Sequence, residues 1–417
     1  MRFMPGARAR RAAARTVSEP AAAAGAGRRA RLAQGLGLDR NTTAVAGAMF
    51  LMGLGEELWK RFIPKYLASL GAPVLAIGLY GTTEDLLDAL YQYPGGWVAD
   101  RYGRRRALLL FVTLAAAGYA CFWAAPAWPW IFAGQALAMA WASMASPTLF
   151  AVVGDALPKG RRSVGFAVQS VVRRLPIAVA PALGGLAIAA YGLRAGIRAG
   201  LVAAMALAAV TLAAVSSVRL PVIREEAAGG VRGVWGSFPA RLRRLLACDI
   251  LVRTCEGMVD VFVVLYALDV VGISAPRFGV LVTVQMMTAI LSYFVGARIA
   301  ARFGQDAAVT LTFAAFSLYP LAVALAGSFA GLAGAAVVGG LREIGEPARK
   351  AMIVDFAEPH LRARSVGLYY LVRSLAVTPA AFVGALLWRG SPALPFFVAA
   401  GAGFLGTALF AWSEGLR

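Results

Sequence analysis

The chain has 417 residues, 60% of them hydrophobic, and its mean hydropathy is +0.69. Soluble globular proteins are about 45–50% apolar, so this composition excludes an ordinary soluble domain and predicts membrane-spanning helices. The net charge of +20 lies between the apolar runs, so we attribute it to membrane topology and expect no nucleic-acid partner.

Residues 1–42 form a basic segment without a long apolar run. Nine arginines are offset only by Glu19 and Asp39, which predicts a disordered cytoplasmic tail. A secretory signal would need an apolar stretch, which this segment lacks, and a cleaved transit peptide is the alternative.

Twelve apolar runs follow the tail and predict an all-α membrane protein. We predict spans at 43–66, 74–98, 106–125, 128–151, 164–190, 198–218, 246–269, 277–298, 306–327, 328–351, 365–388 and 393–413. They divide into an N-terminal six-helix bundle (43–218) and a C-terminal one (246–417), joined by a cytoplasmic linker (219–245). Basic residues in the linker predict a helix on the inner membrane surface: Arg241, Arg243 and Arg244.

The basic residues predict the orientation. With both termini inside, the cytoplasmic segments hold 29 of the 41 Lys and Arg residues, the external segments five and the spans seven. This asymmetry predicts a multi-pass protein of the cell (inner) membrane with both termini in the cytoplasm.

The two halves repeat at an offset of about 200 residues. The matching pairs include Tyr66 with Tyr266, Pro147 with Pro347, Asp155 with Asp355 and Arg173 with Arg373. Because each half holds an even number of spans, the halves are expected to be pseudo-symmetric about an axis along the membrane normal.

Charged side chains are costly inside a membrane, so their distribution is informative. The spans 106–125, 306–327 and 393–413, and the stretch 199–217, carry none in their cores, since Arg106 and Asp306 stand at span ends, and they are expected to face lipid. The charged spans are expected to surround a polar central cavity, and purely structural ion pairs are the alternative. The candidate substrate and proton pathway residues are Glu56, Glu57, Lys60, Arg61, Glu84, Asp85, Asp88, Arg173, Arg174, Arg253, Glu256, Asp260, Arg342, Glu343, Glu346 and Arg373.

Proton coupling needs a group that changes charge within the membrane. The carboxylates are the candidates because the single histidine, His360, lies in a loop. Glu56 and Glu57 lie one helical turn from Lys60 and Arg61, which either tune these acids or neutralise them permanently.

The second span adds Glu84, Asp85 and Asp88, of which the first and last share a helix face. Like charges on one face require a cation or a bound proton. The expected countercharges, which alternatively bind an anionic group of a solute, are Arg173, Arg174 and Arg373. Since five acids of the first two spans face four bases, one acid is expected to carry a proton.

Other side chains complete the expected path. Pro347 is expected to kink the tenth span as a gate hinge. The three cysteines form no spacing motif, so we expect no disulfide framework, no metal and no cofactor. The candidate path-lining aromatics are Trp59, Tyr66, Tyr80, Tyr91, Tyr93 and Tyr266.

The loop after the second span reads Gly-Trp-Val-Ala-Asp-Arg-Tyr-Gly-Arg-Arg-Arg from Gly96 to Arg106. It resembles the signature of the major facilitator superfamily, Gly-x-Leu-Ala-Asp-Arg-x-Gly-Arg-Lys/Arg, with Val98 in place of Leu. Together with the twelve spans and the repeat, this resemblance implies a two-bundle transporter that works by alternating access.

The resemblance also implies gating residues. In the family the motif's Asp, here Asp100, latches the two bundles by pairing with arginine and the N-terminus of the eleventh helix. Gly96 is expected to allow close helix approach and Gly103 a tight turn. The second-half copy has Ala301 at the Asp position.

Two further loops resemble the family's charge-relay loops after the fourth and tenth helices. They pair Asp155 with Arg162 and Asp355 with Arg364, and plain loop charges are the alternative. The complete gating set is Gly96, Asp100, Arg101, Gly103, Arg104, Asp155, Arg162, Asp355 and Arg364.

In the fifth span, Ala180-Pro181-Ala182-Leu183-Gly184-Gly185 resembles the Gly-Pro-x-x-Gly-Gly element of drug:proton antiporters. Here Pro181 is expected to kink the helix, and Gly184 and Gly185 to permit close helix packing. The arginine that such antiporters carry in the fourth helix is absent from 128–151, which argues against proton antiport.

The sequence therefore predicts a monomeric secondary transporter of a small polar or charged solute, with proton-coupled efflux placed ahead of uptake, uniport or lipid flipping. The absence of a Gly-x-x-x-x-Gly-Lys-Ser/Thr loop excludes ATP as the direct energy source. A membrane enzyme is disfavoured because one histidine cannot build a His-based site. A receptor or scaffold without transport is the other alternative class.

Overall fold

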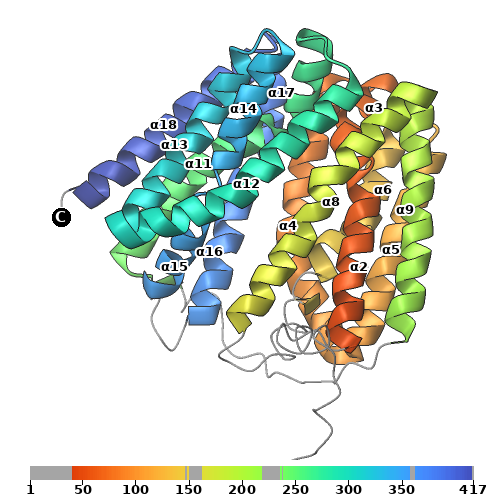
Figure 1. Cartoon of the computed structure of the whole chain (residues 1–417), viewed down its shortest axis with the longest axis horizontal. Helices are drawn as coiled ribbons and strands as arrows, with labels where there is room; N and C mark the ends of the chain where they lie inside the picture. Colours follow the sequence, from red (N-terminus) through yellow and green to blue (C-terminus); the bar gives the residue numbers. More distant parts are fainter. Residues whose placement is uncertain are drawn as a thin grey trace, which may run out of the picture.

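The computed structural model describes residues 40–145, 148–149, 162–217, 235–236, 238–356 and 362–415. These residues form α-helices with short 3-10 and π segments, and no strand occurs among them (Figure 1). Residues 1–39 of the predicted tail, most of the predicted linker, and the loop positions Asp155 and His360 lie outside the described residues.

The helices of the first half follow the predicted spans closely. They are α2 (Arg40–Glu57), α3 (Ile63–Ser69), α4 (Val74–Tyr102), α5 (Arg104–Ala124), α6 (Pro129–Met139), α8 (Arg162–Tyr191) and α9 (Leu193–Ser216). Those of the second half are α11 (Ala240–Leu265), α12 (Ala275–Phe303), α13 (Gln305–Ala324), α14 (Phe329–Leu341), α15 (Glu346–Phe356), α16 (Arg362–Val377), α17 (Ala380–Trp388) and α18 (Leu394–Gly415).

Seven stretches of the described helices are long and apolar enough to cross a membrane by themselves. They are Arg104–Ala124, Val172–Tyr191, Leu193–Ser216, Ala275–Phe303, Gln305–Ala324, Ser365–Trp388 and Leu394–Ser413. The other predicted spans fall short because they carry several charges or are interrupted. These interruptions and charges gather around the centre of the molecule, where water and ion pairs replace lipid.

Several spans are interrupted by short non-α segments. The first breaks at a 3-10 turn, Lys60–Phe62, between α2 and α3, and the fourth passes into a π-helical segment, Ala140–Met144. The tenth breaks between α14 and α15, so Arg342 and Glu343 lie in a turn. Pro347 is the second residue of α15, so it stands at the start of a new helix and does not kink a continuous one as predicted. The gate hinge at this break stays a prediction.

The repeat is visible in the backbone. Gly103 and Gly304 link the second span of each half to the third with φ of 87° and 89°, a conformation that glycine adopts without strain. The breaks of the fourth and tenth spans also fall about 200 residues apart. The fold is therefore two pseudo-symmetric six-helix bundles around a central cavity.

The predicted surface helix in the linker is wrong. Arg241, Arg243 and Arg244 belong to the first turns of α11, which runs unbroken from Ala240 to Leu265. The arginines are exposed, whereas the intervening leucines, Leu242 and Leu245, are buried, so the helical period itself extends the seventh span.

The two bundles meet along α8 with α12 and along α4 with α17. Gly279 of α12 lies against the backbone of Pro181 and Ala182 in α8, and Gly78 of α4 lies against Ala381 of α17. These positions lie in the upper half of the molecule as drawn in Figure 1, near the end where α3 and α17 are labelled. Small residues thus bring the bundles into backbone contact at the upper end.

The predicted packing roles of glycines are met in part. Gly185 lies against Ala275 and Gly184 against the carbonyl of Leu58, so both permit close approach as expected. The expectation for Gly96 is wrong, because open space surrounds it. Its neighbour Gly95 instead contacts the backbone of Met144.

Candidate functional site

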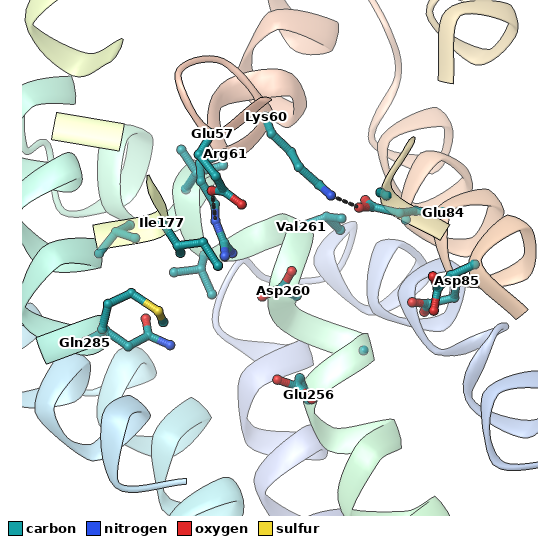
Figure 2. Close-up of a pocket in the computed structure, with 18 of the residues that line it drawn as sticks. Glu57, Lys60, Arg61, Glu84, Asp85, Ile177, Glu256, Asp260, Val261 and Gln285 are labelled. Carbon is teal, nitrogen blue, oxygen red and sulfur yellow. Dashed lines mark hydrogen bonds and ion pairs between the residues drawn. The ribbon is translucent and has the colours of Figure 1, made fainter. Parts of the chain in front are cut away.

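A central cavity of about 930 Å³ lies between the two bundles and is lined by residues of both (Figure 2). Every candidate pathway residue except Glu346 lines it. Lining residues toward the upper end, such as Pro64 and Phe278, are buried, whereas Arg173 and Lys350 toward the lower end are exposed. The cavity therefore opens toward the lower end of Figure 1, where α15 and α16 meet the grey trace.

The first span places two bases among its acids. Lys60 Nζ lies 2.9 Å from Glu56 Oε1 and 3.1 Å from Glu84 Oε1, so it joins α4 to the first span (Figure 2). Arg61 Nε lies 3.3 Å from Glu57 Oε2. The break after α2 turns both basic side chains into the cavity, and each pair is a charge-assisted hydrogen bond at helical i,i+4 spacing or across helices.

Two aspartates of α4 are left by these pairs. Asp88 accepts a hydrogen bond of 2.7 Å from Ser143 in the π-helical segment. Asp85 makes no hydrogen bond or ion pair with any described residue, and its Oδ2 lies 3.7 Å from where a Cβ on Gly257 of α11 would be. The side chain of Asp85 therefore lies close to α11 of the C-terminal bundle. Figure 2 draws Asp85 near Glu84, with Asp260 farther toward the centre of the view.

The arginines predicted as countercharges make no ion pair with Glu84 or Asp88 among the described contacts. Arg174 donates to Glu343 across the bundles at 2.9 Å, and Arg373 lies 3.5 Å from Asp249. Arg173 is exposed on the cavity wall. Arg174 and Arg373 pair with other acids instead, because helical spacing predicts the helix face on which a residue lies but not its partner on another helix.

On the opposite side, arginines of α11 and of the α14–α15 turn share one acid. Glu256 pairs with Arg253 at 2.9 Å and with Arg342 at 3.0 Å. Arg342 Nε donates to the carbonyl of Gly339, and its guanidinium stacks on the ring of Tyr319 at 4.4 Å. The free carbonyl at the end of α14 therefore holds Arg342 in place.

The charges of the cavity fall into two groups. Among the described residues the lining contains eight acids and eight bases, and ion pairs join acids to bases in both groups, but acids outnumber bases in one group and bases outnumber acids in the other. We call the first group the acidic wall. Its bases are Lys60 and Arg61, and its acids are Glu56, Glu57, Glu84, Asp85, Asp88 and Asp260. We call the second group the basic wall. Its acids are Glu256 and Glu343, and its bases are Arg173, Arg174, Arg253, Arg342, Lys350 and Arg373.

A buried network lies behind the basic wall and was not predicted from the sequence. Arg349, 2% exposed in its side chain, donates to Asp249 at 2.6 Å and in a bidentate pair to Glu346 at 2.8 and 3.1 Å. Tyr369 donates to the same Asp249 oxygen at 3.0 Å. Glu346 also pairs with Arg253, so this predicted pathway residue lies behind the wall rather than on it.

Two ion pairs cross between the bundles at different levels. Lys65 pairs with Asp269 at the upper end, beside the ring contact of Phe62 with Phe278. Arg174 of α8 pairs with Glu343 nearer the lower end, where Tyr293 also donates to Glu343 at 2.7 Å. Charged contacts therefore bridge the bundles on both sides of the cavity centre.

Of the predicted path aromatics whose side chains are described, only Tyr80 lines the cavity. Trp59 packs on Tyr119 and Phe122 inside its own bundle, and Tyr266 donates to the carbonyl of Ala324. The others, Tyr66 and Tyr91, are also absent from the lining. The structure instead places in the lining Trp141, Phe278, Tyr293 and Tyr319.

The predicted gating residues are described only in part. Arg101 is exposed and lies over the ring of Trp97, Arg104 is buried at the start of α5, and Asp355 is exposed on the last turn of α15. The side chains outside the described residues are those of Asp100, Asp155, Arg162 and Arg364. Within the described part of the chain, no group of three or more His, Cys, Asp and Glu could hold a metal ion.

Two helical bundles around a charged, water-accessible cavity define a polytopic membrane transporter. A family model described as Major Facilitator Superfamily matches residues 45–248 and again 245–415, and the chain belongs to this family. The family points to a transporter rather than an enzyme. No curated protein matches the chain.

Solved transporters share the fold. A crystal structure of the nucleoside transporter NupG superposes with a TM-score of 0.76 at 12% identity, covering 89% of this chain and 99% of that one. A POT family transporter in complex with 5-aminolevulinic acid gives 0.73 at 14% identity, covering 88% and 95%. The human organic anion transporter MFSD10 gives 0.65 at 19% identity, covering 89% and 99%.

Proposed function

We propose that the protein moves a small zwitterionic solute across the membrane in exchange for protons. The observation that carries this proposal is the division of the cavity into an acidic and a basic wall. An amine on the solute would bind the carboxylates of the acidic wall, and an acid group on the solute would bind the guanidinium groups of the basic wall. The similar solved transporters include a nucleoside transporter, POT family transporters bound to a conjugated peptide or to 5-aminolevulinic acid, and an organic anion transporter, and such solutes are polar or charged.

Asp85 is the acid that we propose to carry the proton. Glu56 and Glu84 share Lys60, Glu57 has Arg61, and Asp88 accepts from Ser143, whereas Asp85 and Asp260 make no hydrogen bond or ion pair with any described residue. Asp260 is exposed, so water can solvate its charge, whereas Asp85 is half-buried. An ionised carboxylate without a partner is costly in a low-dielectric site. Its position against Gly257 of the other bundle means that a rocking motion would change its surroundings.

The direction of transport and the orientation follow from two sequence features. The 29-to-5 asymmetry of basic residues supports a cytoplasmic lower end and cytoplasmic termini, in the inner membrane. The antiporter-like element around Pro181, which packs at the interface of α8 with α12, supports export over uptake. The described state would then be open to the cytoplasm and closed outside by Lys65 with Asp269.

The test uses purified protein in liposomes with an imposed proton gradient and a panel of labelled solutes. The panel contains a dipeptide, a nucleoside, 5-aminolevulinic acid and an organic anion without an amine. We expect gradient-driven flux of a zwitterion, lost in Asp85→Asn, whereas exchange of solute for solute continues because it needs no net proton step. Asp306→Asn, at an exposed acid on α13, is the matched control.

Four outcomes would contradict the proposal. Full gradient-driven flux in Asp85→Asn would place the proton elsewhere, and flux that ignores the gradient would indicate uniport. Binding of a solute without flux of any kind would indicate a receptor. A gradient of the opposite sign driving accumulation would indicate uptake.

A further inference from the structure

Asp249 of α11 is shared by more arginines than it can satisfy. It is completely buried, and its Oδ2 accepts from Arg349 at 2.6 Å and from Tyr369 at 3.0 Å. The same oxygen lies 3.5 Å from Arg373 Nη1, and Oδ1 lies 3.8 Å from Arg253 Nε. The last two distances are ion-pair contacts that are too long for hydrogen bonds.

The polar atoms at these long contacts are left without partners. Asp249 Oδ1, Arg253 Nε and Arg373 Nη1 are buried and make no hydrogen bond. Buried unpaired donors of a charged group are costly, and such atoms in a folded protein call for an explanation. In the connected network Asp249, Glu256 and Glu346 face Arg253, Arg342, Arg349 and Arg373, which leaves one positive charge uncompensated.

The two under-satisfied arginines both line the cavity. Arg373 rests on the ring of Tyr370 at 4.7 Å and Arg253 on that of Phe316 at 4.5 Å, which fixes their guanidinium planes. Lys350 and Ser374 line the cavity as well. Fixed guanidinium groups with spare donors are suited to a planar or tetrahedral anion.

We propose that Arg373 and Arg253 form an anion subsite that binds the carboxylate or phosphate group of the transported solute. Asp249 and Tyr369 are positioning residues, which hold the arginines from behind without touching the solute. The inference rests on the proposed function, because it assigns the acid group of the solute to one place on the basic wall. One bound monoanion would neutralise the excess charge of the network and accept from the Arg373 nitrogens that are not buried, while Nη1 stays directed at Asp249.

The first experiment measures binding without transport. Potassium sulfate, phosphate and acetate are titrated into the purified full-length protein, with chloride as the reference, and the dissociation constants are compared. We expect at least one probe to bind more tightly than chloride, and Arg373→Gln to weaken it about 10–100-fold. Arg389→Gln, at an exposed arginine on the same span, should leave the constants unchanged.

The geometry of the preferred probe separates the two chemistries, since acetate mimics a carboxylate and the tetrahedral ions mimic a phosphate group. Wild-type binding no tighter than chloride, or Arg373→Gln binding as the wild type does, would overturn the subsite. If sulfate binding depends on Arg373 but no solute moves in liposomes, the proposed function fails and the subsite stands.

The second experiment does not remove Arg373, so it remains informative if Arg373→Gln does not fold. Ser374→Cys and Ala142→Cys are made in a Cys121→Ser background, since the other two cysteines are buried. Thiol reagents carrying a sulfonate should react several-fold faster than ammonium reagents at position 374, and sulfate should slow them. The preference should reverse at position 142, beside Asp88. Equal rates of both reagents at both positions would refute the proposal.

Discussion

Asp249→Asn should destabilise the protein more than any other single neutralisation in the buried network. In the wild type, Asp249, Glu256 and Glu346 face Arg253, Arg342, Arg349 and Arg373, so the network carries one excess positive charge. The substitution leaves two acids against four bases and raises the excess to two. Removing one partner of a buried ion pair costs about 3–5 kcal/mol, and we expect a loss of this size.

Arg349→Met should cost less, although it deletes more hydrogen bonds. It leaves Asp249, Glu256 and Glu346 facing Arg253, Arg342 and Arg373, three acids against three bases, so no charge is left uncompensated. The double variant with both substitutions restores the wild-type excess and should be more stable than Asp249→Asn alone. A simple ion-pair account predicts equal losses for the two single variants, so the asymmetry distinguishes the two accounts.

The assay is the apparent melting temperature of the detergent-purified protein at a fixed heating rate, because unfolding of such proteins is commonly irreversible. With roughly 2 °C per kcal/mol, Asp249→Asn should lower it by about 6–10 °C. Asp306→Asn, at an exposed acid, should stay within about 0.5 kcal/mol of the wild type. The reasoning is refuted if Asp249→Asn melts with this control, or if the double variant is as unstable as the sum of the singles.

Three further predictions concern how the bundles meet. Gly279→Val should weaken the contact between α12 and α8 by about 1–3 kcal/mol and slow transport, because a Cβ there meets the backbone of α8. Gly367→Ala, in open space, should leave the transport rate unchanged. Lys65→Glu should slow flux about two- to fivefold and the added Asp269→Lys should recover it, so an unchanged rate in the single variant would remove this pair from the closure. Asp100→Asn should slow transport with solute affinity nearly intact, and wild-type turnover would contradict its latch role.

The positions of the helices could be predicted because they depend on local composition. The predicted span 164–190 corresponds to α8 (Arg162–Tyr191) and 393–413 to α18 (Leu394–Gly415), within a few residues. Apolar runs bounded by basic loops give this result without any knowledge of packing. The charged residues inside spans likewise identified the lining of the cavity, because lipid excludes them from the outer surface.

The pairing of those charges could not be predicted, because it depends on which helices cross at which depth. Lys60 reaches Glu84 from the 3-10 turn at which the first span breaks after α2. Pro64, at the start of α3, signals that break, but it does not show which helix the Lys60 side chain meets. Asp249 was overlooked although it lies four residues before Arg253 in an apolar run, a spacing typical of an intrahelical pair. Its role depends on Arg349, 100 residues away, and that contact has no signature in the sequence.

The distribution of partners is what connects the fold to a mechanism. Where the chain has supplied each acid with a base, as for Glu57 with Arg61, the pair is a fixed part of the wall and has little reason to change state. Among the lining residues that are not exposed, the groups left incompletely paired include Asp85 on one wall and Arg253 with Arg373 on the other. A transporter needs such groups, because only side chains without a permanent partner gain from binding a proton or a solute and lose that gain when the bundles move. Unequal pairing, rather than the number of charges, therefore points to the working residues.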